Sequence, residues 1–359
     1  MQGPTKPLAV RLGVPLLAAA MLWAGVSAAL AQAPPALRLR VVGGLGALNQ
    51  YTRHEAPFWA TRLAQISGGR FAADIVPFDG AGLRSQELLL LLKQGTVPFA
   101  TLSLSAASAK DLELNAVDLA GLNPDFATLR RSAAAYRAHL ETVLLERYGL
   151  EMLALYTYPA QVVFCNKPIT GLDSLKGRRI RTASATQGDW AEALGAQPVI
   201  TPFAEIVASM TAGSIDCAIT GTMSANTIGL HERATHLHTA ALTWGLSVFV
   251  ANGAAWAALP VELRALLKRE LSQLERNIWD ESQRETDEGI ACNVGAAACL
   301  NGRKGRMSAV RPSPADEQRR REIFTAAVLP RWLQRCGPAC AEIWNRTLAP
   351  GSGFVAKQP

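Results

Sequence analysis

Residues 167–185 read KPITGLDSLKGRRIRTASA, and the predicted fold is organised around this stretch. The pattern predicts a loop, a helical turn that Asp173 can cap, a glycine turn at Gly177 and a strand at 179–182. Alternation along that strand places Arg179 and Arg181 on one face. Because a guanidinium is a rigid fork of donors that keeps its charge, Arg181 at the strand end is a candidate carboxylate receptor. The alternative interpretation is a solvated surface arginine.

Strands and helices alternate on both sides of this stretch. Before it, the sequence predicts strands at 37–42, 71–76, 96–102 and 150–158, with helices at 51–66 and 85–94. After it, helices at 188–194 and 202–212 and a strand at 215–220 form a second unit. Such alternation predicts an α/β fold with a parallel sheet covered by helices on both faces. Ligands collect at the carboxyl ends of strands in open α/β sheets, which makes the Ser103 region a candidate site.

A polar–apolar pattern runs without interruption from Leu259-Pro260 to about Glu288. A helix of roughly 29 residues at ~1.5 Å each would be about 43 Å long. Since one small domain does not need a helix of that length, we expect it to span two lobes.

The N-terminus has the features of a secretory leader. Lys6 and Arg11 precede an apolar run from Leu12 to Ala29, and Ala29-Leu30-Ala31 fits the cleavage rule, with Gln32 as the first mature residue. A transmembrane anchor is the alternative, but Pro15 interrupts the run and no positive stop-transfer cluster follows it. No later segment approaches the ~20 apolar residues of a membrane span. We therefore expect an exported, soluble mature protein.

The charge balance suits a small acidic ligand. Loss of Lys6 and Arg11 with the leader lowers the formal net charge from +7 to +5. This charge is too diffuse to indicate nucleic-acid binding, and the basic run Arg319–Arg321 is interpreted as a solvated helix face. A mature chain of about 328 residues is long enough for two domains, each with its own core.

The chain contains six cysteines. An even number in an exported protein favours disulfides. Proximity in the sequence makes Cys292–Cys299 and Cys336–Cys340 the simplest pairs, and Cys165 and Cys217 are expected to be buried thiols. Zinc binding is the alternative, although neither close pair has C-x-x-C spacing.

At this point the residues carry a family resemblance that covers nearly all of the mature sequence. The chain resembles the DctP-like solute-binding proteins of tripartite ATP-independent periplasmic (TRAP) transporters. The motifs that carry this resemblance lie in a specific order and spacing: Ser67-Gly68-Gly69-Arg70, Gly95-Thr96-Val97, Asn166-Lys167-Pro168-Ile169, the Leu175-Lys176-Gly177 turn with Ile180-Arg181, Leu194-Gly195-Ala196, Gly213-Ser214-Ile215-Asp216, and Asn252 to Leu259-Pro260.

The resemblance implies a two-lobed, type II-like periplasmic binding protein that closes on an organic acid, and Arg181 matches the family's carboxylate-binding arginine. Gln161 stands where family members often have a second pocket arginine, and Thr220 where many have an asparagine. Ser103 stands where the sialic-acid-binding members have an acid. These departures argue against a sialic-acid-like ligand. Tyr158 and Trp244 are further candidates for the apolar part of the cleft, with core packing as the alternative for each.

The expected organisation has a signal peptide at 1–31 and two lobes. Lobe I comprises 32–158, with roughly 245–285 returning to it, and lobe II comprises 159–244, with roughly 286–359 packed on it. The resemblance implies an organic acid and TRAP membrane subunits as partners, a periplasmic location, and no catalytic residue, cofactor or metal. A monomer is expected, and a dimer is left open.

Rival functions lack comparable motifs. An exported hydrolase would need a nucleophile and a base, but the chain has no G-x-S-x-G and no evident acid–histidine arrangement. His231, His236 and His238 have no defined metal-ligand spacing. A binding protein of an ATP-driven importer, or a ligand-presenting partner of a sensor, shares the same two-lobed design, and only the family motifs favour the TRAP assignment.

Overall fold

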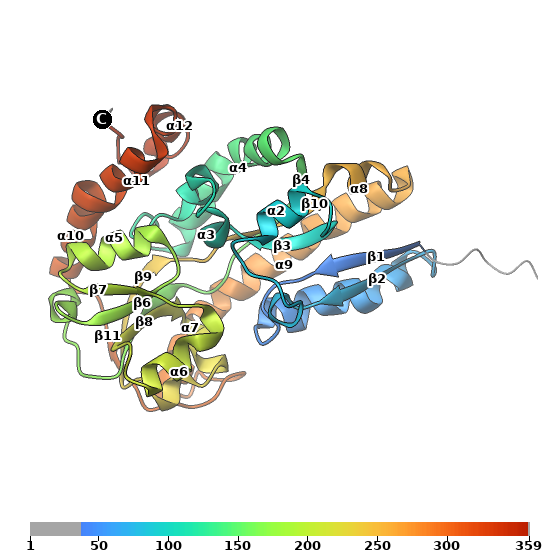
Figure 1. The fold of residues 1–359 in the computed structure, drawn as a ribbon. Coiled ribbons are helices and arrows are strands. Elements are labelled where there is room, and N and C mark those ends of the chain that lie inside the picture. The colour runs from blue at the N-terminus through green and yellow to red at the C-terminus, as the bar shows by residue number, and fades with distance from the viewer. Residues whose placement is uncertain (1–36, 358–359) are drawn as a thin grey trace, which may run out of the picture. The chain divides into compact units, whose positions relative to one another are not determined.

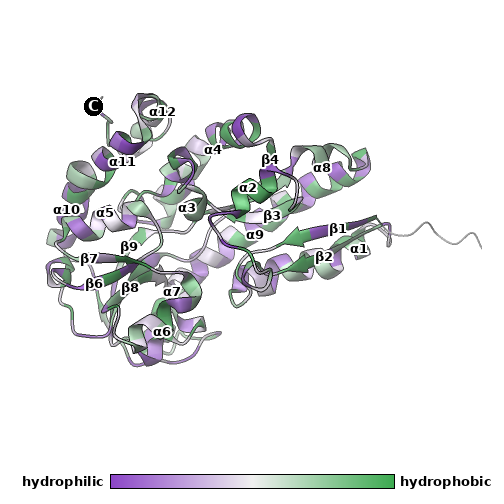
Figure 2. Ribbon diagram, in the orientation of Figure 1, coloured by the Kyte–Doolittle hydropathy of each residue, from purple (hydrophilic) through white to green (hydrophobic). Residues whose placement is uncertain are grey.

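The computed structural model describes residues 37–357, so the predicted leader at 1–31 lies outside the described residues. The chain forms two β-sheets with helices packed against them (Figure 1). The predicted two-lobed α/β class is confirmed. Figure 2 shows apolar residues along many of the strands, as expected for sheets that are covered by helices.

The first sheet has the strand order β2-β1-β3-β10-β4. Its strands are β1 (Leu37–Val42), β2 (Phe71–Val76), β3 (Phe99–Ser103), β4 (Leu150–Tyr156) and β10 (Ser247–Asn252). β1 pairs in parallel with β2 and β3, whereas β10 runs antiparallel to β3 and β4. The expectation of a purely parallel sheet is therefore wrong, because β10 enters from the second sheet instead of following a crossover helix.

The second sheet has the order β11-β9-β5-β8-β6-β7. Its strands are β5 (Gln161–Cys165), β6 (Arg179–Thr182), β7 (Gln197–Ile200), β8 (Cys217–Gly221), β9 (His236–Thr243) and β11 (Ser308–Val310). β6 lies between β7 and β8 and is parallel to both, while β5 is antiparallel to β8 and β9. The carboxyl ends of β6 and β8 and the start of β5 therefore meet at one edge of this sheet.

Apart from α4 (Phe126–Tyr148) and the long helix described below, the α-helices of the described residues are short. These short helices are α1 (Leu63–Ile66), α2 (Leu88–Lys93), α3 (Leu104–Ala107), α5 (Ala185–Ala193), α6 (Ile206–Thr211), α7 (Thr222–Thr227), α8 (Gly253–Ala257), α10 (Pro314–Ile323), α11 (Leu329–Cys336), α12 (Pro338–Thr347) and α13 (Ala349–Ser352). The helix predicted at 51–66 is two π-helical turns, Gln50–Glu55 and Phe58–Arg62, followed by α1. Among residues 37–357, every helix is too short or too polar to cross a membrane.

The long helix α9 (Val261–Val294) joins the two sheets, as predicted. Its N-terminal half buries Leu263, Leu267 and Leu271 in a core that contains residues of the first sheet. Its C-terminal half contacts α7 beyond the second sheet, where Asn293 Nδ2 donates to the carbonyl oxygen of Thr222 at 2.9 Å. The helix α9 therefore packs against elements of both sheets.

Two further segments connect the sheets: residues 157–160, between β4 and β5, and residues 244–246, between β9 and β10. They run side by side, because Tyr158 N donates to the carbonyl oxygen of Trp244 at 3.2 Å. We refer to them as the crossing segments.

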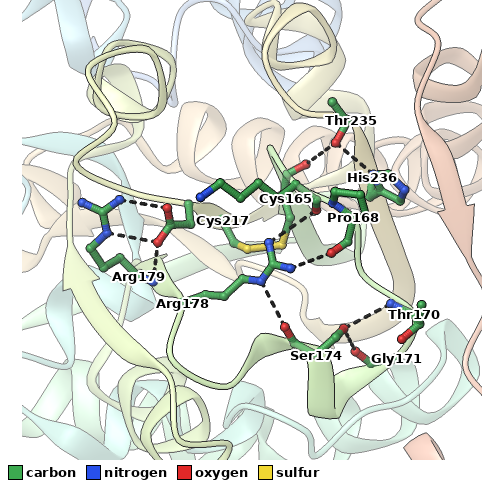
Figure 3. The surroundings of a disulfide bond; sticks show 12 residues. Cys165, Pro168, Thr170, Gly171, Ser174, Arg178, Arg179, Cys217, Thr235 and His236 are labelled. Carbon is green, nitrogen blue, oxygen red and sulfur yellow. Dashed lines mark hydrogen bonds and ion pairs between the residues drawn. A yellow bond between two sulfur atoms is a disulfide. The ribbon is translucent and has the colours of Figure 1, made fainter.

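Three disulfides cross-link the described part of the chain. The predicted pairs Cys292–Cys299 and Cys336–Cys340 are both present. The expectation of free thiols at Cys165 and Cys217 is wrong, because these residues face each other on β5 and β8 and form a third disulfide, with Cα atoms 4.0 Å apart (Figure 3). Antiparallel pairing brought together two residues that lie 52 positions apart in the sequence.

The C-terminal helices contact elements beside both sheets. Trp332 Nε1 on α11 donates to the carbonyl oxygen of Leu112 at 3.1 Å, and Arg320 Nη1 on α10 donates to the carbonyl oxygen of Gly121. On the side of the second sheet, Arg335 Nη1 donates to the Asp189 carboxylate on α5 at 3.0 Å.

Candidate functional site

Arg181 lies on β6, between β8 and the edge strand β7, where the carboxyl ends of β6 and β8 meet. Only 5% of the residue is exposed. Its Nε donates to the carbonyl oxygen of Thr201 at 2.9 Å, and its Nη1 to that of Ile219 at 2.7 Å. Both acceptors are uncharged, and no carboxylate among the described residues pairs with this guanidinium. Burial lowers the pKa of Arg181 to about 10. The alternative of a solvated surface arginine is therefore excluded.

The neighbouring arginines of the same run have their partners within the protein. Arg179 binds Asp216 through Nη2 at 2.8 Å and Nε at 3.0 Å, and this pairing lowers the pKa of Asp216 to about 2. Arg178 donates to the carbonyl oxygens of Ser174 and Pro168 (Figure 3). Arg181 thus stands apart from both, as a buried cation without an anion.

The guanidinium keeps donors for a ligand. Of its five N–H groups, two are used by Thr201 and Ile219, which leaves three. Nη2 forms no hydrogen bond with any described residue. It is also not one of the fully buried polar atoms that lack a partner, so it is not sealed in the core. A carboxylate is the group that such a fork binds best, through two parallel charge-assisted hydrogen bonds.

Thr220 lies beside Arg181. Arg181 pairs with Ala218 on β8, so the alternation of side chains puts Thr220 on the same face. Thr220 is buried, and its hydroxyl makes no hydrogen bond with another described residue. The structure therefore brings together two of the residues that the sequence predicts for the site.

Gln161 belongs to the same edge but has partners. Its Oε1 accepts hydrogen bonds from Gln187 Nε2 and Thr243 Oγ1, each at 2.9 Å. Gln187 is in the first turn of α5, which Ser184 caps by accepting the N–H of Gln187. Since Gln161 pairs with Gly221 and not with Thr220, its side chain begins on the opposite face from Arg181.

Tyr158 lies in a crossing segment, and Ser103 is the last residue of β3 in the first sheet. Tyr158 lies against Gly44, where an added β-carbon would be 3.0 Å from the tyrosine oxygen. Ser103 caps α3 by accepting the N–H of Ala106. The next residue, Leu104, donates its N–H to the carbonyl oxygen of Leu246 in a crossing segment at 3.0 Å.

Trp244 is buried in the core. Its indole N–H donates to the carbonyl oxygen of Asn123 at 3.0 Å, and its ring meets Phe126 edge-on. Its backbone N–H donates to the Asp118 carboxylate. These contacts favour the packing alternative for Trp244, since they leave its only polar side-chain atom occupied.

Sequence reasoning missed three buried acids near the crossing segments. The Asp118 carboxylate accepts the N–H groups of Trp244 and Gly245, each at 2.9 Å, and burial raises its pKa to about 7. Glu55 accepts the N–H of Gly44 and the hydroxyl of Thr101, each at 2.6 Å, and burial raises its pKa. Asp118 was detectable, because it is a lone acid within the apolar run Ala116–Leu122.

The third acid, Glu285 on α9, lines a crevice between elements of the two sheets. Burial raises its pKa to about 7, and its carboxylate accepts a hydrogen bond from Asn49 Nδ2. The crevice is lined by Leu48, Asn49, Gln50, Tyr158, Pro159, Met223, Ser224, Thr227, Ser282 and Glu285. Tyr158 is the sequence-predicted site residue among them. The residues of this crevice come from segments far apart in the chain, so no local pattern reveals it.

The three clustered histidines do not form a common centre. His231 follows α7, His236 begins β9, and His238 is buried 3.6 Å from Asp316. Within residues 37–357, no group of three or more His, Cys, Asp or Glu side chains is arranged to hold a metal ion.

A family model for the bacterial extracellular solute-binding proteins of family 7 matches residues 45–297. Among solved structures, DctP7 of Bordetella pertussis, an extracytoplasmic solute receptor binding pyroglutamic acid, has a TM-score of 0.75 at 20% identity, covering 87% of this chain and 99% of that one. A TRAP periplasmic solute-binding protein of Desulfovibrio salexigens with bound orotic acid has a TM-score of 0.75 at 16% identity, covering 89% and 99%.

A TRAP periplasmic solute-binding protein of Shewanella oneidensis with bound succinate has a TM-score of 0.72 at 19% identity, covering 88% and 99% of the two chains. Among curated proteins, the outer membrane transporter protein TsaT of Comamonas testosteroni is 28% identical over 223 residues. That match covers 59% of this chain and 63% of TsaT, so it spans less than two thirds of that relative.

Proposed function

The chain belongs to family 7 of the bacterial extracellular solute-binding proteins, the DctP-like receptors of TRAP transporters, and we propose that it captures a small organic acid through Arg181. The ligand lies between the two lobes and is delivered to the membrane subunits of a TRAP-type secondary transporter. The predicted leader directs the protein to the periplasm.

One observation carries this proposal: Arg181 is a buried guanidinium whose protein partners are both neutral. An ion that leaves water loses several kcal/mol of solvation free energy, and a nearby opposite charge can compensate for this loss. A ligand carboxylate supplies that charge and fills the three free N–H groups. The acids named for the structural neighbours, pyroglutamic acid, orotic acid and succinate, all carry a carboxyl group and support this ligand class.

The same geometry supports a binding cycle. In the proposed division, lobe I comprises residues 32–158 with roughly 245–285, and lobe II comprises 159–244 with roughly 286–359. Ser103 and Tyr158 approach from lobe I, while Arg181, Thr220 and Gln161 belong to lobe II. A ligand held by both sides stabilises the closed arrangement only by its differential affinity for it.

Titration calorimetry with purified protein tests the proposal. Small organic acids are first screened by the shift in melting temperature, because a ligand that binds only the folded state stabilises it. For each acid that binds, Arg181→Ala should abolish the binding heat. Arg179→Ala is the matched control, because Arg179 lies two residues away on the same strand and is paired with Asp216. Unchanged affinity in Arg181→Ala would remove Arg181 from the site and the proposal with it.

A further inference from the structure

Among residues 37–357, the buried lysine and arginine side chains are Arg181, 5% exposed, and Arg320, 4% exposed. Arg320 is neutralised by Glu317, with Nε 2.8 Å from its carboxylate. Arg181 is therefore the one buried cation of this part of the chain whose charge no acid balances.

The free donors of Arg181 suffice for one carboxylate. Nε is held by Thr201, and one hydrogen of Nη1 is held by Ile219. The remaining hydrogens, two on Nη2 and one on Nη1, can meet both oxygens of a single carboxylate end-on. The predicted site residues at the same edge of the sheet, Thr220 and Gln161, are uncharged, and Gln161 Oε1 is already occupied.

Three carboxyl groups are buried around Tyr158. Glu55 is 0% exposed, Asp118 2% and Glu285 7%. The partners of these carboxylates are backbone N–H groups, hydroxyls and amides, and no lysine or arginine in the described part of the chain forms an ion pair with them. These three residues are referred to below as the buried acids.

All three buried acids lie close to Tyr158. Glu55 Oε2 and the Tyr158 oxygen flank the same point at Gly44, 3.2 and 3.0 Å from where a β-carbon would lie. Asp118 binds the N–H of Gly245, and a β-carbon there would be 3.5 Å from the Tyr158 ring. Glu285 and Tyr158 line the same crevice. A ligand that extends from Arg181 toward Tyr158 therefore approaches these acids.

A second carboxylate on such a ligand would meet two penalties. It would leave water without a cation to pair with. It would also approach buried acids that repel it once they are ionised, in a medium of low dielectric constant where repulsion is stronger than in water. An amide or hydroxyl at the same position meets neither penalty, because it is uncharged and can donate a hydrogen bond.

We propose that this site selects acids with one carboxylate and an uncharged remainder, and that it rejects dicarboxylates. The inference rests on the proposed function, since it assumes that Arg181 receives a ligand carboxylate. Selectivity comes from the count of charges: among the described residues, one unbalanced buried cation is available for a carboxylate, and the ionisable groups buried around Tyr158 are acids.

The test compares each dicarboxylate with its own monoamide, which has nearly the same size but one charge less. Calorimetry at pH 8 would use three pairs: succinate and succinamate, glutarate and glutaramate, terephthalate and terephthalamate. We expect the monoamide of any pair that binds to have at least a tenfold lower Kd. A dicarboxylate that binds as tightly as its monoamide, with binding lost in Arg181→Ala, would overturn this inference and leave the proposed function standing. Binding of neither class, here or in the wider screen of acids, would overturn both.

A charge variant tests the origin of the selectivity. Glu285→Gln keeps an amide oxygen for Asn49 and removes one buried acid, so we expect the affinity ratio of a pair to fall at least threefold. Glu281→Gln is the matched control one helical turn away, where the glutamate is paired with Arg53 at 2.9 Å and with His54. An unchanged ratio in Glu285→Gln, or an equal fall in both variants, would overturn the role of the buried acids.

Discussion

Gly245 packs directly against the side chain of Gln161: a β-carbon on Gly245 would lie 2.5 Å from Gln161 Nε2. Gly245 also has a positive φ of 67°, which side chains other than glycine adopt only with strain. A crossing segment and the edge of the second sheet therefore meet at a point where an added side chain would displace the Gln161 amide.

Gly245→Ala should destabilise the protein and weaken ligand binding together. The positive φ costs about 1–2 kcal/mol and displacement of Gln161 adds to it. Gly213→Ala is the matched control, since its φ is 69° but nothing lies within 4 Å of the added carbon. Urea unfolding and calorimetry on both variants measure the difference. Equal losses of stability, with unchanged binding in both, would show that the contact with Gln161 is unimportant.

Arg181→Met should separate stability from function. Burial lowers the pKa of Arg181 to about 10, which corresponds to about 3 kcal/mol against the charged folded form. Loss of its two hydrogen bonds costs about 1 kcal/mol each. We expect the ligand-free variant to gain about 1 kcal/mol in the free energy of unfolding while losing its ligand-induced melting shift. Strong destabilisation of the ligand-free variant would mean that another group already compensates the charge.

Glu285 and Glu281 should have opposite effects on the pH dependence of stability. The pKa of Glu285 is raised from 4.5 to about 7 by burial, so the folded state holds a proton that the unfolded state has released. This contribution is complete below pH 4.5 and is lost as the pH rises to about 7. Glu285→Gln should therefore reduce the loss of stability over this window, by about 3 kcal/mol.

The pKa of Glu281 is lowered, first by its hydrogen bond with His54. Its contribution is present above the unfolded pKa and is lost as the pH falls. Glu281→Gln should thus flatten the acid side of the stability curve. Urea unfolding of both variants between pH 3 and 8 measures these slopes, and changes of the same sign in the two variants would contradict the assignment.

The disulfides should differ in their contribution to stability. In the chain-entropy description, closing 52 residues between Cys165 and Cys217 contributes about 4 kcal/mol. Closing four residues between Cys336 and Cys340 contributes about 2 kcal/mol. The double variant Cys165→Ala/Cys217→Ala should therefore melt below Cys336→Ala/Cys340→Ala in thermal unfolding. The reverse order would show that native packing, and not loop closure, sets the difference.

Local patterns predicted much of the fold. The strands at 37–42, 71–76 and 179–182 have the predicted bounds, and α9 lies where the polar–apolar pattern predicts it, ending six residues later than expected. These elements follow from alternation, helical periodicity and glycine turns, which act between residues close in sequence. The strand β9 and the antiparallel direction of β10 depend on pairing across the chain, which those patterns do not encode.

The sequence by itself determined the family, the two α/β units and Arg181 as the candidate receptor, because short ordered motifs and a charged strand end are local properties. Only the tertiary structure decided that Arg181 lacks a counter-ion while Arg179 has one, that Cys165 bonds to Cys217, and that Trp244 is buried. It also brought Glu55, Asp118 and Glu285 to Tyr158. Burial and charge pairing depend on residues that are distant in sequence, so they are fixed only when the sheets and the crossing segments pack together.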